Sequence, residues 1–152
     1  ETALSIPLHG ICTHDAIAAA AELPIDPAAA AEEATALVAT DARRKEIYWA
    51  TYRATDSGVQ RISGPAVTKP AELEVELAST AEVIIPDRLV EQLPERLAAL
   101  PHRAAHPSAA ALVGAADLEA EPAPVVPLYL RRPDAVPPKQ QQLSAAIPKV
   151  EL

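Results

Sequence analysis

The sequence contains no phenylalanine and no methionine, and aromatic residues make up only 3% of its 152 residues. Because hydrophobic residues still account for 49% of the chain, the core must be built from Leu, Ile, Val and Ala. Small side chains each bury little apolar area, and burial contributes roughly 25 cal/mol per Å². The length suits one domain or one and a half. We therefore expect a modestly stable unit that depends on a neighbouring domain.

The chain also has few residues that would mark an export or membrane pathway. A single cysteine, Cys12, excludes an internal disulfide and fits a reducing compartment. No apolar run approaches the roughly 18 residues of a membrane-spanning helix. The N-terminal region lacks the basic segment of a signal peptide. These features together predict a cytoplasmic protein without a membrane partner.

Charge and glycine content restrict the function further. A net charge of −8 argues against a lobe that grips nucleic acid unaided, but it leaves open a role in a complex whose partner binds RNA. Only four glycines are present, at positions 10, 58, 64 and 114, and they form no phosphate-binding glycine loop.

The chain begins at Glu1 and opens with an apolar stretch, which favours a piece of a longer protein.

The pattern of residues predicts three strands followed by alternating helices and strands. Strands are expected at 35–40, 46–53 and 59–62, and the turn residues between them favour an antiparallel meander. The next expected elements are a helix at 71–77, a strand at 81–85, a helix at 88–100 that Pro94 splits or kinks, a short strand at 102–106 and a helix at 109–118. The β-β-β-α-β-α-β-α order is that of the ribonuclease-H-like α/β lobe of the actin-like ATPase (ASKHA) fold.

On this interpretation the chain has four parts. Residues 1–35 are the closing elements of a missing N-terminal lobe, with a helix at about 13–23 capped by Thr13, followed by a linker. Residues 36–118 form the ribonuclease-H-like C-terminal lobe. Residues 119–134 form a tail segment that packs on this lobe, and Tyr129 is expected to anchor it by burial. Residues 135–152 are expected to be flexible.

Four segments together resemble the TsaB (YeaZ) family, also called glycoprotease-like or peptidase-M22-like proteins. They are IPLHGICTHDA at 6–16, ATDARRKEIYWA at 39–50, HPSA at 106–109 and PLYLR at 127–131. The segment at 39–50 looks like the family's D-A-R-x-x-E-h-Y-W-A hairpin, and that at 127–131 looks like its closing P-x-Y-L-R. The chain departs from the family at 86–88, where Pro-Asp-Arg replaces the usual Gly-x-Gly turn.

The resemblance implies a non-catalytic scaffold in the synthesis of N6-threonylcarbamoyladenosine at position 37 of tRNA. It implies pairing with a catalytic paralogue, TsaD, and an ATPase, TsaE, with tRNA reached indirectly through the complex and homodimers formed when the paralogue is absent. It implies no catalytic residue, no metal and no cofactor of this lobe's own. Because the glycine turn is absent, this lobe is not expected to bind ATP by itself. ATP binding would need the missing lobe together with a partner.

The candidate contact residues are Asp41, Arg43 and Arg44 in the first hairpin and Arg131 near the tail. One interpretation is a solvated turn and a docked tail; the other is a polar platform that touches a partner or the bound tRNA. In the second strand, Tyr48 and Trp49 should point to opposite faces, so that one enters the core and the other does not.

Two histidine clusters leave alternative functions open. His102 and His106, spaced by four residues, are the ligands that an M22-type metallopeptidase would need. His9, Cys12 and His14 form a second cluster, and Cys12 with His14 could make a nucleophile pair. No third ligand is clearly placed beside His102 and His106, and neither Cys12 nor His14 is set in a glycine-rich elbow. The remaining alternative is an ATP-binding lobe like that of sugar kinases.

Overall fold

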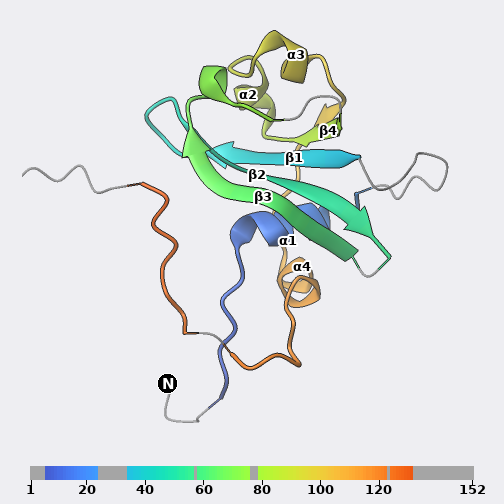
Figure 1. Ribbon diagram of the computed structural model, residues 1–152, viewed down its shortest axis with the longest axis vertical. Coiled ribbons are helices and arrows are strands. Elements are labelled where there is room, and N and C mark those ends of the chain that lie inside the picture. The colour runs from blue at the N-terminus through green and yellow to red at the C-terminus, as the bar shows by residue number, and fades with distance from the viewer. Residues whose placement is uncertain (1–5, 24–33, 57, 76–78, 123, 132–152) are drawn as a thin grey trace, which may run out of the picture.

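The computed structural model describes residues 6–23, 34–56, 58–75, 79–122 and 124–131. Within them a five-stranded mixed sheet has the order β3-β2-β1-β4-β5 (Figure 1). The strands are β1 (Thr35–Asp41), β2 (Ile47–Thr55), β3 (Gly58–Thr68), β4 (Thr80–Ile84) and β5 (His102–Arg103). The helices are α1 (Thr13–Ala20), α2 (Asp87–Val90), α3 (Glu95–Ala98) and α4 (Ala109–Gly114).

The sheet confirms the fold class. β1, β2 and β3 form an antiparallel meander, and β1 also pairs with β4 in parallel, with Leu37 opposite Val83. β4 in turn pairs in parallel with β5. Three antiparallel strands followed by parallel additions on the far side of β1 match the ribonuclease-H-like order that the sequence predicts.

Helices cover both faces of the sheet, so the central strand β1 is buried on both sides. Alternate side chains of β1 serve two cores: Val38 joins the core beneath α1, and Leu37 joins the core beneath α2 and α3. The second core is filled by Leu89, Leu93 and Leu97. Figure 1 shows α1 and α4 on one side of the sheet and α2 and α3 on the other.

The helix at the start of the chain packs on this sheet. Ile17 and Ala18 of α1 lie in the same core cluster as Val38 of β1 and Tyr52 of β2. The Arg103 guanidinium donates to the backbone carbonyl of Ala21, just beyond the end of α1, and to the Glu82 carboxylate. This helix, which the sequence pattern predicts to be a closing element of an N-terminal lobe, thus shares a core with the sheet, a contact that the pattern does not predict.

Several elements differ from their predicted form. Pro70–Glu72 is a short 3₁₀ turn with residues 73–75 non-helical, so the helix predicted from 71 is wrong over 71–75; 76–78 lie outside the described residues. Pro94 does split the helix predicted at 88–100, because α2 ends at Val90 and α3 starts at Glu95. Cys12, not Thr13, holds the cap position of α1, without a side-chain hydrogen bond. The linker at 24–33 and the tail after 131 lie outside the described residues.

The two outer segments of the chain are extended arms. Residues 6–12 lead into α1, and 124–131 return from beyond α4 toward the sheet (Figure 1). The arms expose Ile6, Leu8, Val125, Val126, Leu128 and Tyr129. Tyr129 is 80% exposed, so the prediction that it anchors the tail by burial is wrong. None of the helices in the described part of the chain is long and apolar enough to cross a membrane.

Candidate functional site

The hairpin between β1 and β2 is a strained turn held by Asp41. The Asp41 carboxylate accepts a hydrogen bond from the backbone amide of Arg43 at 2.7 Å. Arg43, Arg44 and Lys45 then have backbone φ angles of 62°, 55° and 61°, in the left-handed region that non-glycine residues rarely adopt. All three side chains are exposed. The turn therefore projects three consecutive cationic side chains from the end of the sheet.

A cationic side chain also binds Asp41, from the helix that follows the neighbouring parallel strand. Arg88, just beyond β4, places its guanidinium 3.3 Å from the other Asp41 carboxylate oxygen. The amide of Arg43, first, and the guanidinium of Arg88, second, hold the pKa of Asp41 below its usual range. Asp41 is therefore an ionised anchor of the turn. The carboxyl ends of parallel strands meet at one edge of a sheet, which is why Arg88 arrives here.

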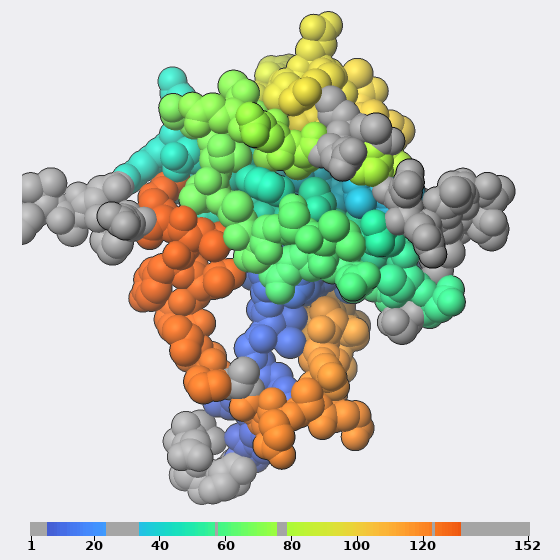
Figure 2. Space-filling view, viewed as in Figure 1, coloured from blue at the N-terminus to red at the C-terminus, as the bar shows by residue number. Residues whose placement is uncertain are grey.

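Arg131 fastens the returning tail to the same hairpin. Its guanidinium donates to the backbone carbonyl of Ala42 at 3.2 Å and to the Glu46 carboxylate. The side chains of Arg131 and Glu46 are only 25% and 28% exposed. Figure 2 shows the hairpin projecting from the body of the molecule, with the end of the tail segment beside its base. Arg131, and not Tyr129, is thus the anchor of the tail.

The predicted candidates are therefore brought together, with additions that sequence reasoning missed. Asp41, Arg43, Arg44 and Arg131 lie on or against one hairpin, joined by Lys45, Glu46 and Arg88. The parallel pairing of β1 and β4 could have pointed to Arg88, since both strands end at this edge. We call the cations Arg43, Arg44, Lys45, Arg88 and Arg131 the carboxyl-edge cluster.

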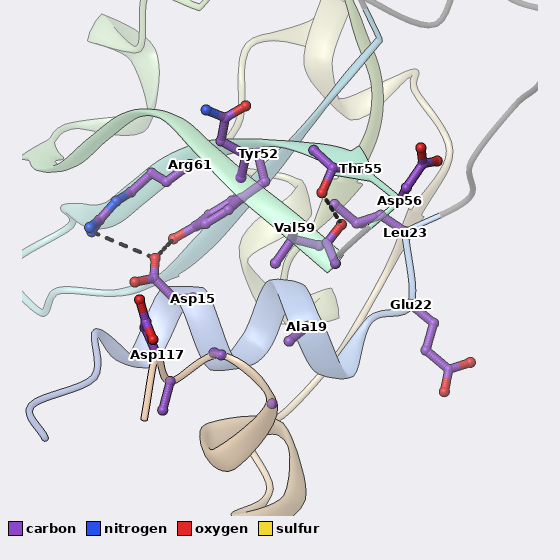
Figure 3. A pocket seen from close by; sticks show the side chains of 15 residues that line it. Asp15, Ala19, Glu22, Leu23, Tyr52, Thr55, Asp56, Val59, Arg61 and Asp117 are labelled. Carbon is purple, nitrogen blue, oxygen red and sulfur yellow. Dashed lines mark hydrogen bonds and ion pairs between the residues drawn. The ribbon is translucent and has the colours of Figure 1, made fainter. Parts of the chain in front are cut away.

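A second polar arrangement lies on the α1 side of the sheet. The Tyr52 hydroxyl donates to the Asp15 carboxylate at 2.7 Å, and Arg61 lies 3.6 Å from the same oxygen (Figure 3). Burial, and then the hydrogen bond to Asp15, raises the pKa of the Tyr52 phenol. These groups line a hollow of about 940 Å³ between α1, the β2–β3 hairpin and α4. Tyr52 is wholly buried, so this network positions α1 on the sheet.

His14 lies on the same face beside a smaller hollow. Its Nε2 atom is 3.1 Å from the hydroxyl of Thr40, and the residue is 6% exposed. A hollow of about 430 Å³ is lined by Cys12, His14 and Tyr48, among others. Burial lowers the pKa of His14, opposed by a backbone hydrogen bond with Tyr48 and by the Asp15 charge, and aided by Arg61. His14 is therefore held in its neutral form.

This burial predicts a pH-dependent stability. The unfolded-state pKa of histidine is about 6.5 and that of folded His14 is lower, so stability present above pH 6.5 is lost as the pH falls through 6.5 toward the folded value. We expect the urea-unfolding free energy to drop between pH 7.5 and 5.5. His14→Gln should flatten that drop, whereas His102→Gln, at an exposed position, should leave it unchanged. An equal pH slope in both variants would contradict the assignment.

The two histidine clusters considered as alternatives form no metal-binding group among the described residues. His102 lies in β5 with its Nδ1 atom 3.3 Å from the Leu100 carbonyl, and His106 is exposed in the segment that follows. His9 is in the arm before α1, whereas His14 lies within α1. Across the described ranges, no three His, Cys, Asp or Glu side chains are grouped closely enough to hold a metal ion.

Tyr48 and Trp49 separate as their alternation requires. Trp49 packs against the core beneath α2 and α3, and Tyr48 borders the hollow near His14 on the opposite face. Both side chains are half-buried, because other parts of the chain pack against each face of β2 at this point. The two side chains do lie on opposite faces, but Trp49 only packs against the edge of a core and does not fully enter it.

The fold defines the class of protein first: a ribonuclease-H-like lobe of the actin-like kind. A crystal structure described as an uncharacterized protein with similarity to peptidase YeaZ, from Pseudomonas aeruginosa, superposes with a TM-score of 0.61. It is 23% identical, and the match covers 85% of this chain and 61% of that one. At this identity the likeness establishes the fold.

The family follows from the sequence match. The family model described as TsaD: tRNA N6-adenosine threonylcarbamoyltransferase matches residues 1–103. The chain belongs to this threonylcarbamoyltransferase family. That membership, with the YeaZ-like fold, confirms the resemblance drawn from the hairpin and closing motifs.

Curated relatives are longer than this chain. It is 42% identical over 139 residues to an uncharacterized protein of Mycobacterium leprae, covering 89% of this chain and 32% of that protein. It is 40% identical over 138 residues to an uncharacterized protein of Mycobacterium tuberculosis, covering 89% and 54%. The chain thus spans between a third and about half of the length of these relatives.

Proposed function

We propose that the protein containing this chain is a non-catalytic scaffold subunit in the synthesis of N6-threonylcarbamoyladenosine at position 37 of tRNA. It pairs with a catalytic paralogue of the TsaD type and an ATPase of the TsaE type, and it forms homodimers when the paralogue is absent. It acts in the cytoplasm and carries no cofactor of its own; ATP is bound only with a second lobe and a partner. Membership of the threonylcarbamoyltransferase family supports the pathway.

The proposal that this lobe is not catalytic rests on the groups that bind the Asp41 carboxylate. In a lobe of this kind, the carboxyl edge of the first and fourth strands is where a phosphate or its metal ion would be held. Here the Asp41 carboxylate is occupied by the Arg43 amide and the Arg88 guanidinium. The turn beyond β4 begins with Pro86, which has no backbone N–H to offer a phosphate. Cation binding at Asp41 would have to displace Arg88.

The two alternatives have less support in the geometry. A metallopeptidase needs His102 and His106 on one helical face, yet β5 ends at Arg103 and the segment at 104–108, up to the Ser108 cap of α4, is not helical. An ATP-binding lobe needs a backbone turn that can approach phosphate closely, and Pro86 and Arg88 stand in that place. Metal analysis and calorimetric titration of the full-length protein with ATP test these alternatives directly.

The proposal predicts loss of the modification when the protein is depleted. We expect nucleoside mass spectrometry of tRNA from depleted cells to show a clear fall in threonylcarbamoyladenosine, restored by the full-length protein. In a reconstituted reaction, the full-length protein alone should form no product, and adding it to the catalytic paralogue and the ATPase should raise the yield. Unchanged modification after depletion would overturn the proposal, and product formed by the protein alone would overturn the non-catalytic role.

A further inference from the structure

The carboxyl-edge cluster reverses the sign of an otherwise acidic chain. The chain carries a net charge of −8 with 13 Lys and Arg residues, and five of those 13 lie at this one edge. The carboxylates within the hairpin turn and the first turn of α2 are Asp41, Glu46 and Asp87, fewer than the five cations. A polyanion is repelled by most of an acidic surface, so it can approach closely only where the local charge is positive.

The turn holds its cations at a conformational cost. The left-handed region is sterically disfavoured for any residue other than Gly, and Asn and Asp tolerate it best among the rest. Three consecutive positions, Arg43, Arg44 and Lys45, adopt this conformation with exposed side chains, so packing does not explain their identity. Residues better suited to the backbone would lack the charge. Strain of this kind is concentrated at functional positions.

The base of the hairpin is made rigid by contacts from three directions. Asp41 binds the amide of Arg43, Arg88 binds Asp41 from beyond β4, and Arg131 binds Glu46 and the Ala42 carbonyl from the tail. Arg88 and Arg131 are therefore committed to internal ion pairs. The tip residues Arg43 and Lys45 are the ones presented outward on a fixed support.

We propose that the carboxyl-edge cluster is a contact surface for the phosphodiester backbone of RNA, with Arg43 and Lys45 as the groups that touch phosphate. The inference rests on the proposed function, which brings the protein and tRNA into one complex. Guanidinium groups match phosphate oxygens in pairs, and the Lys45 ammonium adds a point charge. These contacts position the RNA without reading its bases. The surface adds to an interaction shared with the partner subunits.

The test replaces two tip cations with residues that suit the turn. Arg43→Asn/Lys45→Asn removes two charges, and because asparagine tolerates the left-handed region the fold should be kept or stabilised. Arg96→Glu, at an exposed position of α3, changes the net charge by the same amount and serves as the control. Each variant is made in the full-length protein and assembled with the catalytic paralogue. Binding of an unmodified tRNA transcript is then titrated at several salt concentrations.

We expect the Asn double variant to weaken tRNA binding and to lower the slope of log affinity against log salt by about 2. The Arg96→Glu complex should bind with the slope of the unmodified protein, and Arg43→Lys/Lys45→Arg should restore binding. Equal affinity and slope for the double variant and the control would overturn the inference. Loss of assembly with the paralogue, at unchanged tRNA affinity of what remains assembled, would instead make the surface a protein interface and would also overturn it.

This outcome can be separated from failure of the proposed function. If the unmodified complex forms threonylcarbamoyladenosine and the double variant binds tRNA normally, only the RNA surface is wrong. If the unmodified complex forms none and depletion has no effect in cells, the proposed function itself is wrong.

Discussion

Gly64→Ala is expected to lower the free energy of unfolding by about 3–5 kcal/mol. Gly64 has a φ angle of +83°, and an added Cβ atom would lie 2.7 Å from the carbonyl oxygen of Trp49 and 2.9 Å from the Cα atom of Ala50. Both atoms belong to the backbone of β2, so no side-chain rotation can relieve the contact. The pairing of β2 with β3 shifts register at this point, between Trp49 and Thr51. Urea unfolding of the purified protein measures the change.

Gly114→Ala provides a matched control for the same chemical change. Gly114 is the last residue of α4, and an added Cβ atom there meets nothing within 4 Å. Because alanine is favoured over glycine in a helix, we expect no loss and a gain of up to about 1 kcal/mol. Equal stability of the two alanine variants would contradict the close approach of β3 to β2 at Gly64.

Tyr52→Ala is expected to cost about 3–5 kcal/mol, the range for removing a large buried aromatic side chain. Tyr52 is completely buried in the core shared by α1 and the sheet, where it is one of the largest fully buried side chains. Its removal leaves a cavity beneath α1 and frees Asp15 from its closest donor. Thermal and urea unfolding should both report the loss.

Tyr52→Phe separates the ring from the hydroxyl. We expect it to cost about 1–2 kcal/mol, because the ring still fills the core while the Asp15 carboxylate loses a charged hydrogen bond. Asp15→Asn in the Tyr52→Phe background should then have a smaller effect than Asp15→Asn alone, since the two groups act as a pair. Additive effects would show that the hydroxyl and carboxylate do not interact.

The strands were predictable where local pattern and burial agree. The run at 36–39 is continuously apolar because β1 is covered on both faces, and the β-forming residues at 46–53 predicted β2. The length of β3 was underestimated: only 59–62 was predicted as a strand, whereas β3 runs to Thr68 through Gly64 and Pro65 and across a register shift. The helix expected after Pro70 is reduced to one 3₁₀ turn, since Leu73 is used to fill the core beneath α2 and α3.

Only the part of the candidate site that lies within one stretch of sequence could be predicted. Asp41, Arg43 and Arg44 are adjacent in sequence and belong to one turn motif, so their grouping needs no tertiary information. Arg88 and Arg131 lie 47 and 89 positions from their partners in the hairpin. Sequence pattern alone gives no distance between such residues.

The sequence by itself determined the meander, the ribonuclease-H-like element order, the family and the polar hairpin, because each depends on residues close together in the chain. Only the tertiary structure decided that α1 shares a core with this sheet, that Arg131 rather than Tyr129 fastens the tail, and that Arg88 occupies the Asp41 carboxylate. Those three outcomes depend on which surfaces meet after the sheet has formed. Local propensity does not encode that choice, because it is made by packing between distant segments.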